Sequence, residues 1–405
     1  KGDDYMLDDI KSKLKKYNQE HLLNFYEELN ASEKQHLLDQ IESIDFDLIK
    51  DLMGTVDNKK EASSITPMSS YPSKDEYYQI GLNSILNGEY ALVTMAGGQG
   101  TRLGYDGPKG TCILEFGINK SLFEIQSDKL NNIYQVSNVH IPWYIMTSYA
   151  NNDATVEFFE NNNYFNYPKS KIQFFSQDEL PMVDLTGKIV MDSKYNIKMG
   201  ANGSGGVFLA LSKSGIIDKM KADNIKWVFI GGIDNVLLPV DNPDLVGFAV
   251  ANNYLAASKI IPKDYPEEKV GVFGYRNNVP SVIEYIEMTD EMNNLRDESG
   301  ELVHRDAHIL ANLFNISILE DIAAKNLEYM PALKKTEYLD DKGNLIMPNN
   351  ENAYKFEMFV FDAFSYVDDV GLLQGKREEI FAPIKNKVGV DSLETASKLY
   401  KDFYK

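Results

Sequence analysis

The chain has 405 residues, 43% of them hydrophobic, so it is long enough to bury a large core and to form two or three domains. Its 61 acidic and 41 basic residues give a net charge of −20, which disfavours nucleic acid and anionic lipid as partners. An anionic substrate would therefore need a local positive pocket. The single cysteine, Cys112, excludes an intrachain disulfide, as is typical of a cytosolic protein.

The chain carries no pattern that predicts a membrane partner. No segment approaches the ~18 to 20 uninterrupted apolar residues of a membrane-spanning helix. The first residues, KGDDYMLDDIKSKLKKY, are charged where a signal peptide needs an apolar run. We therefore expect a soluble, cytoplasmic protein.

Helical periodicity dominates the first part of the chain. From Leu7 to about Met53, apolar residues recur at spacings of three and four, and Asn30 or Ser32 is the expected N-cap of a second helix. A polar stretch with two prolines follows and is typical of a linker. Residues 1–74 are thus expected to form an N-terminal helical unit with its linker.

Short apolar runs then alternate with helical stretches over residues 75–330. The expected strands are 90–96, 142–148, 171–176 and 226–232, and the expected helices are 121–136 (capped by Ser121), 153–162, 205–222 and 243–253. This alternation predicts an α/β domain with a mostly parallel sheet that is covered by helices on both faces. Runs at 269–278, 281–288 and 301–306 are expected to add antiparallel strands, and residues 331–405 to form a small mixed C-terminal unit.

A glycine-rich stretch, AGGQGTRLGYDGPKG, follows the first expected strand of this domain at residues 96–110. Glycines let backbone N–H groups approach a phosphate, and Arg102 and Lys109 would neutralise its oxygens. The P-loop pattern fails because Gly110 separates Lys109 from the following threonine. The dinucleotide pattern G-x-G-x-x-G fails because Leu103 stands where the third glycine would fall. This failure argues against a nicotinamide-dependent oxidoreductase. The stretch predicts a phosphate-binding loop of another class.

The pattern G-G-x-G-T-R-L, followed by Pro-Lys, resembles that of the sugar nucleotidyltransferases. Nearly the whole chain resembles the eukaryotic-type UDP-N-acetylhexosamine pyrophosphorylases within the UDP-sugar pyrophosphorylase family. The resemblance includes the segments WYIMTS, FFSQDELP, GIDNVLLPVDNP, PEEKVGVF, VIEYIEM, KFEMFVFDAF and IFAPIKN. It implies a Rossmann-like, glycosyltransferase A-like mixed sheet flanked by helices.

The resemblance also implies a reaction and its partners. A sugar 1-phosphate would attack the α-phosphorus of UTP in line, with Mg²⁺ as cofactor, and the products would be a UDP-sugar and pyrophosphate. Such a transfer needs the protein to align two anions and to neutralise charge rather than to do covalent chemistry. No oligomeric state follows from the sequence.

The resemblance assigns the phosphate contacts to basic side chains. Arg102, Lys109 and Lys355 would be catalytic, with Lys109 near the α-phosphate, and Lys385 would reach the pyrophosphate. A carboxylate at the end of a strand is well placed to hold Mg²⁺ against phosphate oxygens, so Asp234 is the expected metal ligand and nucleotide contact.

Uridine contacts are implied for four residues of three segments: Gly97, Gly98, Gln177 and Gly203. A glutamine side chain donates and accepts at once, which suits the uracil edge with its carbonyl and N–H groups.

Sugar contacts are implied for Ser204, Gly271, Glu284, His308, Phe359 and Phe361. The family usually has asparagine where this chain has Ser204 and His308, and His308 either donates a hydrogen bond to the sugar or packs on a helix. Because of these departures, glucose or galactose 1-phosphate stays an alternative substrate. Phe359 and Phe361, by contrast, match residues that flank the N-acetyl pocket in the family, and they favour an N-acetylhexosamine 1-phosphate. A nucleotide-sugar binding protein that has lost catalysis is the remaining alternative.

Overall fold

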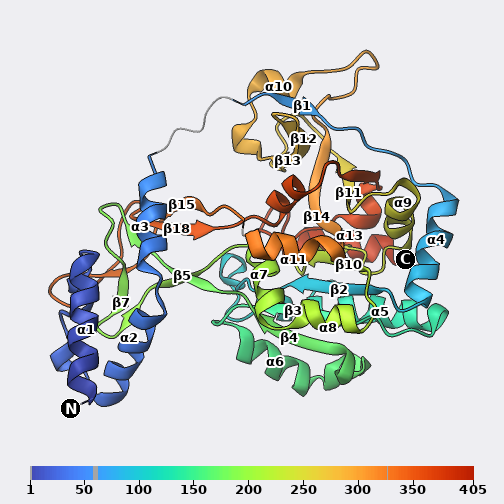
Figure 1. The fold of residues 1–405 in the computed structure, drawn as a ribbon. Helices are drawn as coiled ribbons and strands as arrows, with labels where there is room; N and C mark the ends of the chain where they lie inside the picture. The colour runs from blue at the N-terminus through green and yellow to red at the C-terminus, as the bar shows by residue number, and fades with distance from the viewer. Residues whose placement is uncertain (1, 58–62, 326) are drawn as a thin grey trace. The chain divides into compact units, whose positions relative to one another are not determined.

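The computed structural model describes residues 2–57, 63–325 and 327–405 (Figure 1). The chain divides into two compact units, and each unit is built from three separate segments. The first unit comprises residues 1–61, 178–206 and 328–359, and the second comprises 62–177, 207–327 and 360–405. These units cut across the sequential division into 1–74, 75–330 and 331–405.

The second unit is organised around a ten-stranded mixed sheet flanked by helices. Four strands run parallel in the order β10, β2, β3, β4: Trp227–Gly232, Tyr90–Met95, Trp143–Thr147 and Ile172–Ser176. Every residue of β10, β2 and β3 is buried, as expected for parallel strands that are covered on both faces. The expected α/β fold and all four of these strands are confirmed.

Antiparallel strands extend the sheet beyond β10. The strand β14 (Asp306–Asn315) pairs with β10, and the other additions are β11 (Ala256–Pro262), β12 (Val272–Arg276), β13 (Val279–Ile283), β19 (Gly371–Gln374) and β1 (Ile65–Pro67). The expected strand at 301–306 is wrong. There, Leu302 makes only an isolated bridge to Arg296, and the long strand begins at Asp306.

The helices of the second unit are α4 (Asp75–Leu86), α5 (Leu122–Ser137), α6 (Asn152–Asn161), α7 (Gly206–Lys213), α8 (Ile216–Ala222), α9 (Pro243–Asn252), α10 (Asp290–Asn294), α11 (Ile316–Lys325), α12 (Arg377–Ile380) and α13 (Leu393–Phe403). The α5 helix begins as expected after Ser121, whose side chain accepts a hydrogen bond from the backbone N–H of Glu124. The single helix expected at 205–222 is two helices, because Gly215 adopts a left-handed conformation with φ 75°.

In the first unit, the described residues form three α-helices and four small sheets. Its α-helices are α1 (Gly2–Lys16), α2 (Ala31–Ser43) and α3 (Phe46–Thr55), and Asn30 caps α2 through a capping box with Glu33. The helical periodicity is thus confirmed except between α1 and α2, where the chain forms only the short 3₁₀ segments Glu20–Leu23 and Tyr26–Glu28. The sheets pair β15 (Met330–Lys334) and β6 (Val183–Asp184) with β18 (Ala353–Glu357), β5 (Glu179–Pro181) with β9 (Met199–Ala201), β7 (Met191–Ser193) with β8 (Asn196–Ile197), and β16 (Tyr338–Leu339) with β17 (Leu345–Ile346).

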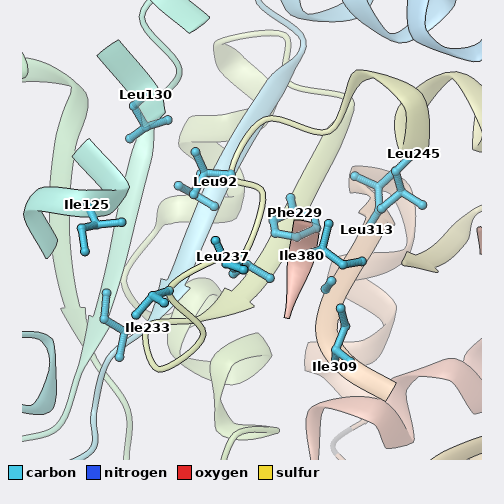
Figure 2. Packing of buried hydrophobic residues seen from close by; sticks show 14 of the residues in the cluster. Leu92, Ile125, Leu130, Phe229, Ile233, Leu237, Leu245, Ile309, Leu313 and Ile380 are labelled. Atoms are coloured by element: carbon cyan, nitrogen blue, oxygen red, sulfur yellow. The ribbon is translucent and has the colours of Figure 1, made fainter. Parts of the chain in front are cut away.

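The core of the second unit anchors the segment that follows β10. Figure 2 shows Ile233 and Leu237 of this segment among buried side chains of the central strands and α5, such as Leu92, Phe229 and Ile125. Ile233 and Leu237 are 5% and 3% exposed. Because apolar side chains hold both sides of Asp234, the position of this carboxylate is set by the core.

Within the described residues, no helix is long and apolar enough to cross a membrane.

Candidate active site

The glycine-rich loop after β2 closes on itself through backbone hydrogen bonds. The N–H of Gly100 donates to the carbonyl of Gly107 at 2.9 Å, and the N–H of Lys109 donates to the carbonyl of Gly98 at 3.0 Å. Gly104 (φ 70°) and Gly107 (φ 143°) adopt conformations that residues with a side chain rarely take. The loop is thus a compact turn whose shape depends on its glycines.

The surroundings of individual glycines separate the packed side of the loop from its open side. A Cβ on Gly110 would lie 2.3 Å from the ring of Phe123, whereas a Cβ on Gly98 would have no atom within 4 Å. Gly98 is exposed, as is Arg102. The backbone near Gly98 is therefore open to a ligand, while Gly110 fixes the end of the loop against α5.

Asn151 ties this loop to the end of β3. Its side chain is fully buried, and Nδ2 donates to the carbonyls of Ala96 (3.0 Å) and Gly98 (3.3 Å). Its Oδ1 accepts from the backbone N–H of Ser148 at 2.9 Å. The sequence analysis did not single out this residue. Its only signal was its position shortly after the expected strand 142–148.

Gln177 lies against the start of the same loop. It is 6% exposed, and its backbone N–H donates to the carbonyl of Thr147 at 2.9 Å, which continues the pairing of β3 and β4. A Cβ on Gly97 would lie 3.2 Å from Nε2 of Gln177. The structure thus brings together Gly97, Gly98 and Gln177, three of the four residues expected to contact uridine.

Lys109 and Asp234 form an ion pair at the carboxyl ends of two neighbouring parallel strands. Nζ of Lys109 lies 3.4 Å from Oδ2 of Asp234, and the side chains are 16% and 38% exposed. Their loops follow β2 and β10, which lie side by side with Met95 opposite Gly232. This edge is where open α/β sheets place their ligands.

A second segment is paired to the Asp234 loop. The N–H of Ile384 donates to the carbonyl of Asp234 at 2.8 Å, and the buried Asn235 bonds through its amide to the carbonyl of Ile380 and the N–H of Ala382. Lys385 follows directly, with its Nζ 3.7 Å from Oδ2 of Asp391. Lys385 therefore belongs to the second unit, near Asp234, rather than to a separate C-terminal unit.

Lys129 supports the same loop from α5. Its Nζ donates to the carbonyls of Val236 (2.7 Å) and Leu238 (2.8 Å). Burial lowers the pKa of Lys129 to about 7, against a weak opposing effect of Asp241. This residue was also missed, because a lone lysine within a helical pattern usually lies on the exposed face.

A cavity of about 280 Å³ in the second unit gathers residues expected to contact sugar, pyrophosphate or metal. Its lining includes Asp234, Gly271, Glu284, His308, Phe361 and Lys385, together with Lys269, Tyr285 and Phe381. Six residues assigned from separate segments thus share one concave surface, as binding sites do.

His308 lies on strand β14, and its ring packs against Phe361 and Phe364 of the 3₁₀ helix Val360–Tyr366, in line with the packing alternative. Its ring centroid is 5.5 Å from that of Phe273 and 5.6 Å from that of Phe361, and Nε2 lies 3.1 Å from Oδ1 of Asn312. Burial lowers the pKa of His308 to about 4, and the hydrogen bond to Asn312 only partly offsets this effect. The imidazole is therefore neutral at physiological pH, with one donor and one acceptor nitrogen.

The remaining expected residues lie together in the first unit. A Cβ on Gly203 (φ 84°) would lie 2.4 Å from the carbonyl oxygen of Met358, which also accepts from the N–H of Gly205 at 2.8 Å. The segment with Gly203 and Ser204 is thus held against the one that contains Lys355 and Phe359. Nζ of Lys355 lies 2.6 Å from Oε1 of Glu357, a partner that the sequence analysis missed.

The carboxylate of Asp234 suits Mg²⁺ only if a substrate supplies further ligands. Among the described residues, no three His, Cys, Asp or Glu side chains are grouped to hold a metal ion. Mg²⁺ commonly binds through one or two carboxylates, substrate phosphates and water. Asp234 at the sheet edge, 38% exposed, meets that requirement.

A family model described as UTP–glucose-1-phosphate uridylyltransferase matches residues 23–402. The chain belongs to this family. The UDP-N-acetylglucosamine pyrophosphorylase of Saccharomyces cerevisiae is 33% identical over 414 residues, which cover 94% of this chain and 87% of that protein. The UDP-N-acetylglucosamine diphosphorylase 2 of Arabidopsis thaliana is 30% identical over 418 residues, which cover 96% and 82%.

The fold of this uridylyltransferase-family chain also matches a solved relative. The UDP-N-acetylglucosamine pyrophosphorylase of Trypanosoma brucei, in complex with an inhibitor, has a TM-score of 0.82 and 27% sequence identity, with 97% of this chain and 84% of that chain covered. The resemblance drawn from the sequence motifs, and the nucleotidyltransferase class that it implied, are therefore confirmed.

Proposed function

We propose that this protein forms UDP-N-acetylglucosamine and pyrophosphate from UTP and N-acetylglucosamine 1-phosphate. The observation that carries the proposal is the near-full-length similarity, at 30% identity or more, to relatives named for UDP-N-acetylglucosamine. The arrangement of the second unit supports it, because a glycine-rich loop, a lysine–aspartate pair and a cavity of suitable chemistry lie in one unit.

The phosphate chemistry falls to the loop and the sheet edge. Open backbone at Gly98, with Arg102 and Lys109 on the same loop, suits the triphosphate of UTP. Lys109 would neutralise charge on the α-phosphate as the pentavalent centre forms. When bound, Mg²⁺ would be held by Asp234 and would add positive charge at the phosphates.

The cavity of the second unit suits a hexose. Glu284 is a hydrogen-bond acceptor for hydroxyl groups. The neutral His308 donates its one N–H to Oδ1 of Asn312, which leaves the other ring nitrogen as an acceptor. The ring of Phe361 next to His308 gives the cavity an apolar wall, which an acetyl group would contact. In the first unit, Ser204 and Phe359 stay predicted sugar contacts, and Gly203 a predicted uridine contact.

A test compares two sugar phosphates with UTP. We expect pyrophosphate release with N-acetylglucosamine 1-phosphate at a kcat/KM at least ten times that with glucose 1-phosphate. A tenfold preference for glucose 1-phosphate would overturn the N-acetyl specificity. It would favour the second candidate function, a UTP–glucose-1-phosphate uridylyltransferase, which is how the matching family model is described. Binding of UDP-N-acetylglucosamine without any pyrophosphate release would instead favour a protein that has lost catalysis.

The proposal includes a cytoplasmic location. A single cysteine, which allows no intrachain disulfide, and a net charge of −20 are consistent with that compartment. Fractionation of cells that express the protein, followed by detection with an antibody, would test this assignment.

A further inference from the structure

Lys269 lines the candidate sugar cavity alongside Asp234 and Lys385, yet neither the sequence motifs nor the proposed reaction gave it a role. It is exposed, and it precedes Gly271, an expected sugar contact, by two residues. A cation at this place is notable in a chain with 20 more acidic than basic residues.

The backbone on both sides of Lys269 is fixed. The carboxylate of Glu268 accepts from Nη2 of Arg377 at 2.9 Å and from the backbone N–H of Asp264 at 2.8 Å. The carbonyl of Gly271 accepts from the N–H of His308 at 2.9 Å. These contacts hold the base of the lysine side chain in place on the cavity wall.

Lys269 forms no ion pair within the part of the chain that the structure describes. Among the described residues, no carboxylate oxygen lies within 4.0 Å of its ammonium group, and its acidic neighbour Glu268 is bound to Arg377. By contrast, Lys385 and Lys109 each lie within 4.0 Å of an aspartate. Of the two described lysines that line this cavity, Lys269 and Lys385, it is therefore Lys269 that is available to an anionic ligand.

We propose that Lys269 binds the phosphate group of the sugar 1-phosphate substrate. This inference rests on the proposed function, because it assigns one residue of that site to one part of one substrate. Lys109 and Arg102 belong to the loop assigned to UTP, whereas Lys269 shares its cavity with Glu284 and His308, which suit the sugar. A phosphate monoester carries about −1.5 to −2 charges at pH 7 and needs its own cation.

The test uses Lys269→Met, Lys269→Arg and a matched control, Lys376→Met. Lys376 lies in the same unit, is paired with Glu379 at 3.0 Å and does not line this cavity. We expect Lys269→Met to raise the KM for N-acetylglucosamine 1-phosphate about tenfold or more, with the KM for UTP within twofold of the parent value. The KM of Lys269→Arg for N-acetylglucosamine 1-phosphate should stay within about threefold of the parent value, and that of the control Lys376→Met should equal the parent value.

A second measurement separates phosphate binding from a structural role. Inhibition by unphosphorylated N-acetylglucosamine should be equal in the parent and Lys269→Met, because that ligand lacks the group that Lys269 binds. The inference would be overturned if Lys269→Met had a KM for the sugar phosphate within twofold of the parent value. It would also be overturned if this variant bound the sugar phosphate and the unphosphorylated sugar more weakly by the same factor.

The experiment also keeps the inference apart from the proposed function. If the parent protein prefers glucose 1-phosphate, the proposed sugar is wrong, and the same variants are compared with that substrate. If the parent has no turnover, calorimetry with N-acetylglucosamine 1-phosphate replaces kinetics. Equal affinity in the parent and Lys269→Met, or no binding to the parent, would then overturn the inference.

Discussion

Lys109 is the side chain on which the proposed transfer depends most. It lies 3.4 Å from Asp234 at the edge of the sheet, with 16% of its side chain exposed. We expect Lys109→Ala to lower kcat about 10²- to 10³-fold, because removing one preorganised donor to a developing negative charge typically has that effect. The assay is pyrophosphate release from UTP and the preferred sugar phosphate.

The control for Lys109→Ala is Lys219→Ala, which removes an exposed lysine paired with Asp223 in the same unit. Both variants should unfold within a few degrees of the parent protein. Near-normal turnover of Lys109→Ala would remove this lysine from the mechanism.

His308 should make the protein sensitive to acid. Its pKa is lowered from 6.5 to about 4 by burial, so the unfolded chain binds a proton at this residue over a range where the folded chain does not. Stability from His308 is therefore complete above about pH 6.5 and is lost as the pH falls towards 4. We expect His308→Gln to show a smaller drop in Tm between pH 7 and pH 4.5 than the parent. Parallel Tm profiles for the two proteins would contradict this expectation.

At the level of helices and strands, local chemistry predicted most of what was observed. The caps at Asn30 and Ser121 and the four parallel strands follow from side-chain type and from runs of apolar residues. The break at Gly215 was missed because the apolar pattern continues through it, and only the left-handed backbone separates the two helices. The strand β14 was missed because its ten residues, DAHILANLFN, lack alternation.

The packing of α4 on α9 depends on two glycines that the sequence did not mark. A Cβ on Gly81 would lie 1.6 Å from the carbonyl oxygen of Pro243, and one on Gly247 would lie 1.7 Å from that of Tyr77. Because both obstacles are backbone atoms, the helices must separate to admit a methyl group. We expect Gly81→Ala and Gly247→Ala each to destabilise the protein by about 3 kcal/mol or more, measured by urea unfolding.

The matched control is Gly54→Ala, because Gly54 lies in α3 and a Cβ there would have no atom within 4 Å. Because alanine has a higher helix propensity than glycine, Gly54→Ala should leave the free energy of unfolding unchanged or raise it by up to about 1 kcal/mol. If Gly247→Ala were as stable as Gly54→Ala, the close helix contact would not exist in solution.

The grouping of segments across the whole molecule could not be read from the sequence. Periodicity predicts each helix and strand, but not that residues 178–206 and 328–359 return to the N-terminal helices. Their shared core buries Val183 and Phe356 with Leu14 and Leu37, and these contacts are remote in sequence. The candidate site was predictable residue by residue only through the resemblance, whereas Asn151 and Lys129 act through three-dimensional contacts that no motif carries.

The dependence of the whole reaction on Mg²⁺ follows from the shortage of carboxylates at the site. Asp234 is the one expected metal ligand, and the described residues contain no cluster that would hold the ion without a substrate. Bound metal would therefore need the phosphates of UTP to complete its ligands. We expect EDTA to abolish turnover and added Mg²⁺ to restore it fully, while the Tm of the substrate-free protein changes by less than about 1 °C, because a ligand that does not bind the folded state cannot stabilise it. Asp234→Asn should raise the Mg²⁺ concentration needed for half-maximal turnover. A large fall in Tm on adding EDTA to the substrate-free protein would instead reveal a metal site formed by the protein alone.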